Sequence, residues 1–256
     1  MVMRSRAFLG VAALLFAACS AVTAVWCASM SAQGGMPMPG GWTMSMAWMR
    51  MPGQTWLRAA ASFLAMWVVM MAAMMLPSLV PMLWRYRQAA ATADTAHLGG
   101  LTALVGAGYF SIWAVFGLAA FPLGAALAGV AMRLPAVARA VPTAVGAVVL
   151  IAGLLQFTAW KARQLDCCRE TPGRGLRADA VTAWRYGMRL GLRCCYCCVG
   201  LTVSLLVIGV MDLRAMAVTT AAVNLERLAG KRVARAIGAA VMAAGLALIA
   251  REAGLV

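Results

Sequence analysis

The chain has 256 residues, of which 64% are hydrophobic and only 11% are charged. Soluble domains carry roughly 25% charged residues, so this composition, with a mean hydropathy of +0.86, excludes a water-soluble fold. The net charge of +15 does not indicate nucleic-acid binding, because no basic, aromatic-interleaved motif is present. Basic loops at the cytoplasmic face of a membrane account for it better. We therefore expect an integral membrane protein whose surroundings are the lipid bilayer.

Apolar runs of about 20 residues cross a bilayer as helices. They predict an all-α, polytopic bundle of about seven transmembrane helices, with six also possible. The predicted spans are 7–29, 59–83, 98–121, 142–160, 194–213, about 214–228 and 234–251. The sixth is the weakest, because Thr219, Thr220 and Asn224 also fit a re-entrant segment or a kinked continuation of the fifth. Residues 1–29 fit an uncleaved helix, which we favour, or a signal peptide.

The distribution of basic residues predicts the orientation. With the N-terminus in the cytoplasm, sixteen of the 22 Lys and Arg residues lie on inner segments and six on outer segments. This asymmetry follows the positive-inside rule. It predicts a multi-pass protein of a bacterial-type inner membrane, with segment 30–58 outside and a Cys-containing polar loop at 161–193 inside, within a helical membrane domain of 59–256.

The outer segment 30–58 is rich in Met, Gly and Pro and has no helical or strand period, so we expect a mobile loop. Thioethers bind Cu(I), and unlike thiols they are not lost to disulfides in an oxidising compartment. The alternative is a flexible loop that lies at the membrane interface. The candidate ligands are Met36, Met38, Met44 and Met46.

The second span carries a dense set of methionines. Met66, Met70 and Met74 recur every four residues and therefore share a helix face, with Met71 and Met75 on a neighbouring stripe. This pattern fits either a thioether ladder for a soft metal or adaptable packing in an apolar bundle. Pro77 and Pro81 each remove a backbone donor near the inner end and predict a kink that frees carbonyl groups.

Four thiols fall within five residues in the run Cys194-Cys195-Tyr196-Cys197-Cys198, and Cys167-Cys168 precede them. If Cys194 begins a helix, then Cys194, Cys197 and Cys198 lie on one face and Cys195 points elsewhere. Three thiolates suit Cu(I) or, less well, part of a Zn(II) site. The alternative role of a small hydrophobe does not explain such a density.

Neighbouring charges bear on this cysteine cluster. Arg189, Arg193 and the helix N-terminus are expected to favour thiolates over thiols. The chain has a single His, His97, which argues against a His-based zinc or iron site. Asp212 and Glu226 lie near membrane ends, where a carboxylate is either functional or paired with a neighbour, Asp212 with Arg214 and Glu226 with Arg227 or Lys231.

Several short motifs together resemble one known family. The run Ala73-Met74-Met75-Leu76-Pro77 with Pro81 resembles the opening signature of the predicted metal-binding integral membrane proteins (domain of unknown function 2182). Later motifs follow in the same order over roughly residues 56–250: Lys161 with Cys168-Arg169, then Cys194, Cys197 and Cys198, then Gly209–Leu213, then Glu226. The resemblance implies a metal-binding membrane fold.

These observations favour a soft-metal protein of the inner membrane. We expect it to bind copper as Cu(I), and less readily zinc, and to act as a relay, chaperone or transporter of the ion between the outer Met loop and the inner Cys cluster. A copper chaperone or copper-enzyme complex is the expected partner. Two alternatives are a membrane thiol–disulfide oxidoreductase and an assembly scaffold for a membrane copper enzyme. No hydrolase triad, phosphate loop or haem-attachment motif is present, so we do not expect an enzyme.

Overall fold

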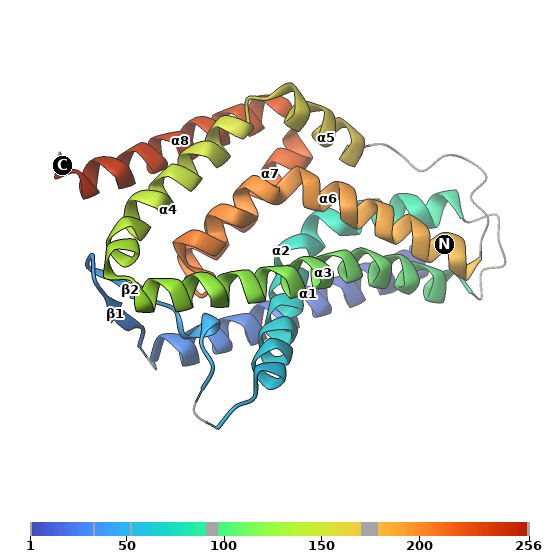
Figure 1. Cartoon of the computed structure of the whole chain (residues 1–256). Coiled ribbons are helices and arrows are strands. Elements are labelled where there is room, and N and C mark those ends of the chain that lie inside the picture. Colours follow the sequence, from blue (N-terminus) through green and yellow to red (C-terminus); the bar gives the residue numbers. More distant parts are fainter. Residues whose placement is uncertain (1, 33, 52, 91–96, 170–178, 255–256) are drawn as a thin grey trace.

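The structure is a computed structural model that describes residues 2–32, 34–51, 53–90, 97–169 and 179–254. Within these residues the chain forms eight helices and one short antiparallel hairpin (Figure 1). The helices are α1 (Val2–Ala32), α2 (Trp56–Ala89), α3 (Leu98–Arg133), α4 (Pro135–Leu155), α5 (Ala159–Arg169), α6 (Ala180–Gly209), α7 (Leu213–Ala229) and α8 (Lys231–Glu252). The predicted all-α bundle is confirmed.

Six of these helices are long and apolar enough to cross a membrane: α1, α2, α3, α4, α6 and α8. The sixth predicted span corresponds to α7, which has 17 residues and is not among them. Besides its exposed apolar residues, α7 carries Asn224, Glu226 and Arg227, all of which are buried inside the protein. The structure therefore supports six long apolar helices rather than seven.

Contacts between helices define two ends of the bundle. Phe8 of α1 packs on Trp84 of α2 with ring centroids 5.9 Å apart, so these two helices run in opposite directions. In α4 and α8, Gly146 faces Ile249 and Gly153 faces Met242, which is again antiparallel. One end, here called the hairpin end, gathers the hairpin, the last turn of α1 and the α6–α7 junction. The opposite end, called the α5 end, carries the first turns of α3 and α6 and also α5, which contacts α6 near its middle.

The predicted polar loop at 161–193 is largely helical, which corrects our expectation. It contains most of α5 and the first half of α6, which begins at Ala180 rather than at Cys194. Asp179 caps α6 by accepting a hydrogen bond from the Thr182 backbone N–H at 2.8 Å. Gly187 lets α3 approach closely, because a Cβ there would lie 2.2 Å from the Val105 carbonyl oxygen. The hydropathy pattern missed this half because three arginines interrupt the apolar residues of its exposed face.

The outer segment is also more regular than predicted. It forms strands β1 (Met36–Met38) and β2 (Trp42–Met44), followed by the 3₁₀ turn η1 (Met46–Trp48). Gly40 and Gly41 have φ values of 104° and 75°, which the tight turn between the strands requires. The Trp42 indole N–H donates to the Ala138 carbonyl at 2.9 Å and anchors the hairpin to α4. The expectation of an unstructured loop was therefore wrong for these residues.

Helix α2 supplies much of the buried core. Its methionines Met70, Met71, Met74 and Met75 are all almost completely buried. The helix is continuous through Pro77 and Pro81, and Figure 1 shows its first and last parts running in different directions. This central position brings α2 against α3, α6 and α7, where the cysteine cluster lies.

Candidate metal centre

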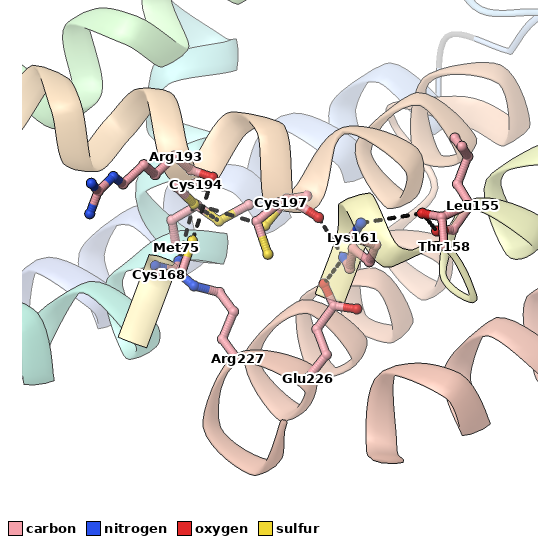
Figure 2. Close-up of polar contacts among 11 residues, drawn as sticks. Met75, Leu155, Thr158, Lys161, Cys168, Arg193, Cys194, Cys197, Glu226 and Arg227 are labelled. Carbon is pink, nitrogen blue, oxygen red and sulfur yellow. Dashed lines mark hydrogen bonds and ion pairs between the residues drawn. The ribbon is translucent and has the colours of Figure 1, made fainter. Parts of the chain in front are cut away.

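Three thiols of α6 lie together in the interior of the helix bundle, near the middle of the helix. Cys194, Cys197 and Cys198 are at most 1% exposed, and the Sγ atoms of Cys194 and Cys198 lie 3.8 Å apart. Cys168 of α5 is also buried in this core, and its thiol donates to the Arg193 carbonyl at 3.5 Å. Met75 of α2 completes the sulfur group, with Sδ 3.9 Å from Cys194 Sγ (Figure 2). The soft donors thus come from three helices.

Cys194 receives two hydrogen bonds at its sulfur. The Tyr109 hydroxyl of α3 donates at 2.9 Å, and Nη1 of Arg227 in α7 donates at 3.1 Å. Arg227 is held in place because its guanidinium also donates to Ser78 Oγ at 2.7 Å and contacts Met82 Sδ at 3.4 Å. Donors to sulfur, one of them cationic, stabilise the thiolate over the thiol.

These contacts correct the source of thiolate stabilisation. Cys194 lies near the middle of α6, so no helix N-terminus acts on it. Arg193 uses its Nη1 to donate to the Cys167 carbonyl at 3.4 Å, and Figure 2 shows its side chain directed away from the thiols. The buried cation that contacts the Cys194 sulfur is Arg227, which the sequence pattern had assigned only as a partner of Glu226.

A buried ion pair lies beside the thiols. Lys161 Nζ of α5 is 2.5 Å from Glu226 Oε1 of α7, and the two side chains are 5% and 0% exposed. Lys161 also donates to the Cys197 carbonyl (Figure 2). The expected partners were wrong: Glu226 pairs with Lys161, whereas Lys231 pairs with Asp166 at 2.7 Å.

The ion pair uses only one oxygen of the Glu226 carboxylate. Among the described residues Oε2 of Glu226 has no hydrogen-bond partner. Ligand atoms of Cys197, Cys198 and Glu226 lie within 4.8 Å of one another, close enough to share one metal ion. Burial raises the pKa of Glu226 to about 7, against the opposing effect of Lys161. Burial alone would lower the pKa of Lys161, but Cys197 and Glu226 outweigh it and raise that pKa.

The charges of the site do not cancel by themselves. Lys161 and Arg227 are positive and Glu226 is negative, so these three buried side chains carry a net charge of +1 when ionised. An uncompensated charge is costly in a low-dielectric interior. Thiolates supply the missing negative charge, and deprotonated thiols are the form of cysteine that binds metals. The site can therefore hold an anionic sulfur group without leaving a buried charge uncompensated.

Comparison with known proteins agrees with this geometry. Residues 64–248 match the copper chaperone family PpoB2. The chain belongs to this family. No curated protein and no solved structure matches it. The match supports copper among the soft metals that the sulfur ligands allow, while the family named from the sequence motifs stays a prediction.

In this member of the copper chaperone family, some of the predicted metal ligands lie together at the cysteine site and others do not. Cys195, on another face of α6, is only half-buried, and so is Cys167. On α2 the Met75 thioether reaches Cys194. Met74 is linked to α7 instead, because its backbone carbonyl accepts a hydrogen bond from Asn224 Nδ2 at 3.0 Å. Met66 lies two turns from Met74 toward the hairpin end and is partly buried.

The remaining predicted residues lie at the hairpin end. Asp212 caps α7, accepting hydrogen bonds from the backbone N–H groups of Arg214 and Ala215 at 2.7 and 3.1 Å. Met36 is exposed, and Met38 and Met44 pack against small residues of α3 and α4. The hairpin methionines are therefore far from the cysteine site along the helix axes.

Sequence reasoning gave no role to three residues that contact Cys194, Glu226 or Arg227. Lys161 entered only through the family resemblance, and Tyr109 and Ser78 were not considered. The sequence did contain a signal for Lys161. This residue directly follows the predicted span 142–160, and the carboxylate of Glu226 near a membrane end needs a basic partner. Nothing in the local sequence of Tyr109 or Ser78 distinguishes them from ordinary helix residues.

Proposed function

We propose that this protein is an integral membrane copper chaperone that holds Cu(I) at the buried cysteine site. The observation that carries the proposal is the convergence of Cys194, Cys197 and Cys198 with the Met75 thioether, next to buried cations that stabilise thiolates. Thiolate and thioether sulfur together select soft metals. The activity is binding and transfer of an ion, with no catalysed bond chemistry.

Charge also favours a monovalent ion. The ionised side chains around the thiols carry a net +1, so Cu(I) brings the total to +2 and two thiolates neutralise it. A divalent zinc ion needs a third thiolate for the same balance, and its structural sites are usually completed by further Cys or His ligands. The only His of the chain, His97, lies at the start of α3, at the α5 end.

The proposed chaperone relays the ion through the bundle. The hairpin end, with its methionines, serves as the outer side and the α5 end as the cytoplasmic side of an inner membrane. The orientation follows from the basic residues, since α5, the first half of α6 and the start of α8 together carry nine of the 22 Lys and Arg residues. A copper chaperone or copper enzyme exchanges the ion at one of these ends.

Copper binding by the purified protein tests the proposal directly. The full chain is purified in detergent under reducing conditions and titrated with Cu(I) against a competing chelator. The triple variant Cys194→Ser/Cys197→Ser/Cys198→Ser is expected to lose the tightly held ion and keep its helical fold, because Ser is nearly isosteric with Cys. Cys195→Ser is the matched control, since it lies in the same run but only half-buried.

The outcome separates the alternatives. Unchanged tight copper binding in the triple variant would remove the proposed site. Thiol–disulfide exchange activity that needs the same cysteines but no copper would indicate the membrane oxidoreductase instead. Copper binding only after a copper enzyme is added would indicate an assembly scaffold.

Labelling of intact cells tests the orientation. Cys167 is half-buried on α5 and is a better probe than the buried Cys197. In a variant that retains only Cys167, an impermeant maleimide is expected to react after the membrane is opened and not before. A cysteine placed at Thr55, the cap of α2 at the hairpin end, is expected to react in intact cells. The reverse pattern would invert the proposed direction.

A further inference from the structure

A methionine-lined cavity opens at the hairpin end. It has a volume of about 560 Å³ and lies between the last turn of α1, the hairpin and the α6–α7 junction. Four methionines from these separate segments line it: Met30, Met44, Met46 and Met211. Met36 and Met38 of the same hairpin are not among its lining residues. The thioethers of distant segments are thus gathered around one open space.

A thiol–thioether pair lies directly below this cavity. Cys27 Sγ of α1 is 3.8 Å from Met216 Sδ of α7, and the two residues are 2% and 5% exposed. Cys27 precedes the lining residue Met30 by about one helical turn, and Met216 follows the lining residue Asp212 by about one turn. The pair is therefore one turn deeper than the cavity wall on two facing helices.

We propose that Cys27 and Met216 form a second Cu(I) site, which is loaded through the methionine-lined cavity. One thiolate and one thioether give Cu(I) two soft ligands. When the ion binds, the Cys27 proton leaves to water in the cavity, and the resulting thiolate and Cu(I) have no net charge. Such a neutral unit is tolerated in an apolar interior, whereas a divalent ion would leave an uncompensated positive charge.

The second site is aligned with the cysteine site. Asn224 contacts Met74 and Arg227 contacts Ser78, so α7 and α2 run side by side in the same direction. Going back two turns along α7 from Asn224 leads to Met216, about 12 Å away along the axis. The buried Met70 lies between these levels on α2 and belongs to the same core. Thioethers therefore lead from the Cys27–Met216 pair toward Met75 and Cys194.

This inference rests on the proposed function only for the identity of the ion, and a separate experiment tests it. Cu(I) binding is measured on the full chain in the Cys194→Ser/Cys197→Ser/Cys198→Ser background, where the cysteine site is absent. This variant is expected to retain a second, more weakly held ion. Adding Cys27→Ser or Met216→Leu is expected to release it. Cys19→Ser is the matched control, because Cys19 lies two turns earlier on the same helix and is only half-buried.

Protection from alkylation gives an independent measurement. With Cu(I) at about ten times the dissociation constant of the second site, the reaction of Cys27 with N-ethylmaleimide is expected to slow about tenfold, while that of Cys19 is unchanged. Changing Met30, Met44, Met46 and Met211 to Leu is expected to slow loading of Cys27, whereas Met36→Leu is expected to have no effect. These measurements need no copper transport by the protein.

The failures of the two proposals differ. If the triple variant binds no copper and Cys27 is not protected, the second site is wrong and the proposed function stands. If the triple variant binds copper as tightly as the unmodified chain and Cys27→Ser abolishes that binding, the second site stands and the cysteine site is wrong. Equal protection of Cys27 and Cys19 would also overturn the second site.

Discussion

The cysteine site and the Cys27–Met216 pair both place sulfur inside the same helix bundle, but their surroundings differ. At the cysteine site Arg227 and Tyr109 donate hydrogen bonds to sulfur, and Lys161 and Glu226 lie alongside. At the Cys27–Met216 pair the contact is between the two sulfur atoms, and the pair lies one helical turn below an open cavity. One site is surrounded by buried charge and the other is adjacent to solvent.

The difference follows from the number of thiolates in each site. The Cys27–Met216 pair has one thiol, whose negative charge after deprotonation Cu(I) itself balances, and one thioether, which has no proton to lose and needs no cation nearby. A group of thiols in the interior must be deprotonated, and the resulting negative charge needs buried partners. The cysteine site is therefore expected to hold the ion tightly and to depend on its charged neighbours. The methionine-lined end is expected to capture and release it.

The largest effect is expected from breaking the charge balance of the cysteine site. Glu226→Gln leaves Lys161 buried without its carboxylate, which should destabilise the folded protein by about 3 kcal/mol or more. Unfolding in detergent by heat or by SDS titration measures this loss. A double variant, Glu226→Leu/Lys161→Met, is expected to recover most of the stability because it leaves no unpaired charge.

The exposed pair at the same end of the bundle provides the control. Asp166 and Lys231 lie 2.7 Å apart, with side chains 58% and 50% exposed. Asp166→Asn is therefore expected to change the stability by no more than about 1 kcal/mol. Equal losses for Glu226→Gln and Asp166→Asn would show that buried charge does not distinguish the cysteine site.

The sequence predicted the parts of this comparison that depend on local patterns. Hydropathy identified the apolar helices, and the spacing of Cys194, Cys197 and Cys198 on one helix face agrees with their shared burial. The mid-helix position of Cys194 was missed, because the first half of α6 carries arginines on its exposed face and does not resemble a membrane span. Local patterns describe one helix at a time.

Contacts between helices could not be predicted from those patterns. The pairing of Lys161 with Glu226 and the approach of Arg227 to Cys194 join residues 65 and 33 positions apart. The contact of Cys27 with Met216 spans 189 positions, and neither residue is part of a local motif. Which of two methionine stripes on α2 meets the cysteines depends on how α2 is rotated against α6, and that rotation is a property of the packed bundle.

An intermediate effect is expected when the cation at Cys194 is removed. Arg227→Met takes away a charge-assisted hydrogen bond to sulfur and should weaken Cu(I) binding about tenfold to a hundredfold. Competition against a Cu(I) chelator measures this affinity. Arg227→Lys keeps the charge, so its Cu(I) affinity is expected to lie between those of the unmodified chain and Arg227→Met. Arg193→Met is the control, because that side chain is directed away from the thiols. Equal affinities for Arg227→Met and Arg193→Met would contradict the assigned role of Arg227.

The smallest effect is expected from the single thioether at the cysteine site. Met75→Leu preserves volume and apolarity, so stability should change little, but it removes the sulfur that lies 3.9 Å from Cys194 Sγ. Cu(I) affinity is expected to fall only a few-fold, by about 0.5–1 kcal/mol, the net value of one weak neutral contact. X-ray absorption at the copper edge should show one sulfur neighbour fewer in this variant.

Met66→Leu is the matched control for Met75→Leu, because Met66 lies on the same helix, more than two turns from the cysteines. It should leave both the affinity and the absorption spectrum of the cysteine site unchanged. If Met75→Leu behaves like Met66→Leu, the cysteine site binds copper through thiolates alone. The contrast between the two regions would then be complete, with thiolates as the only ligands of the charged interior and thioether ligands confined to the hairpin end.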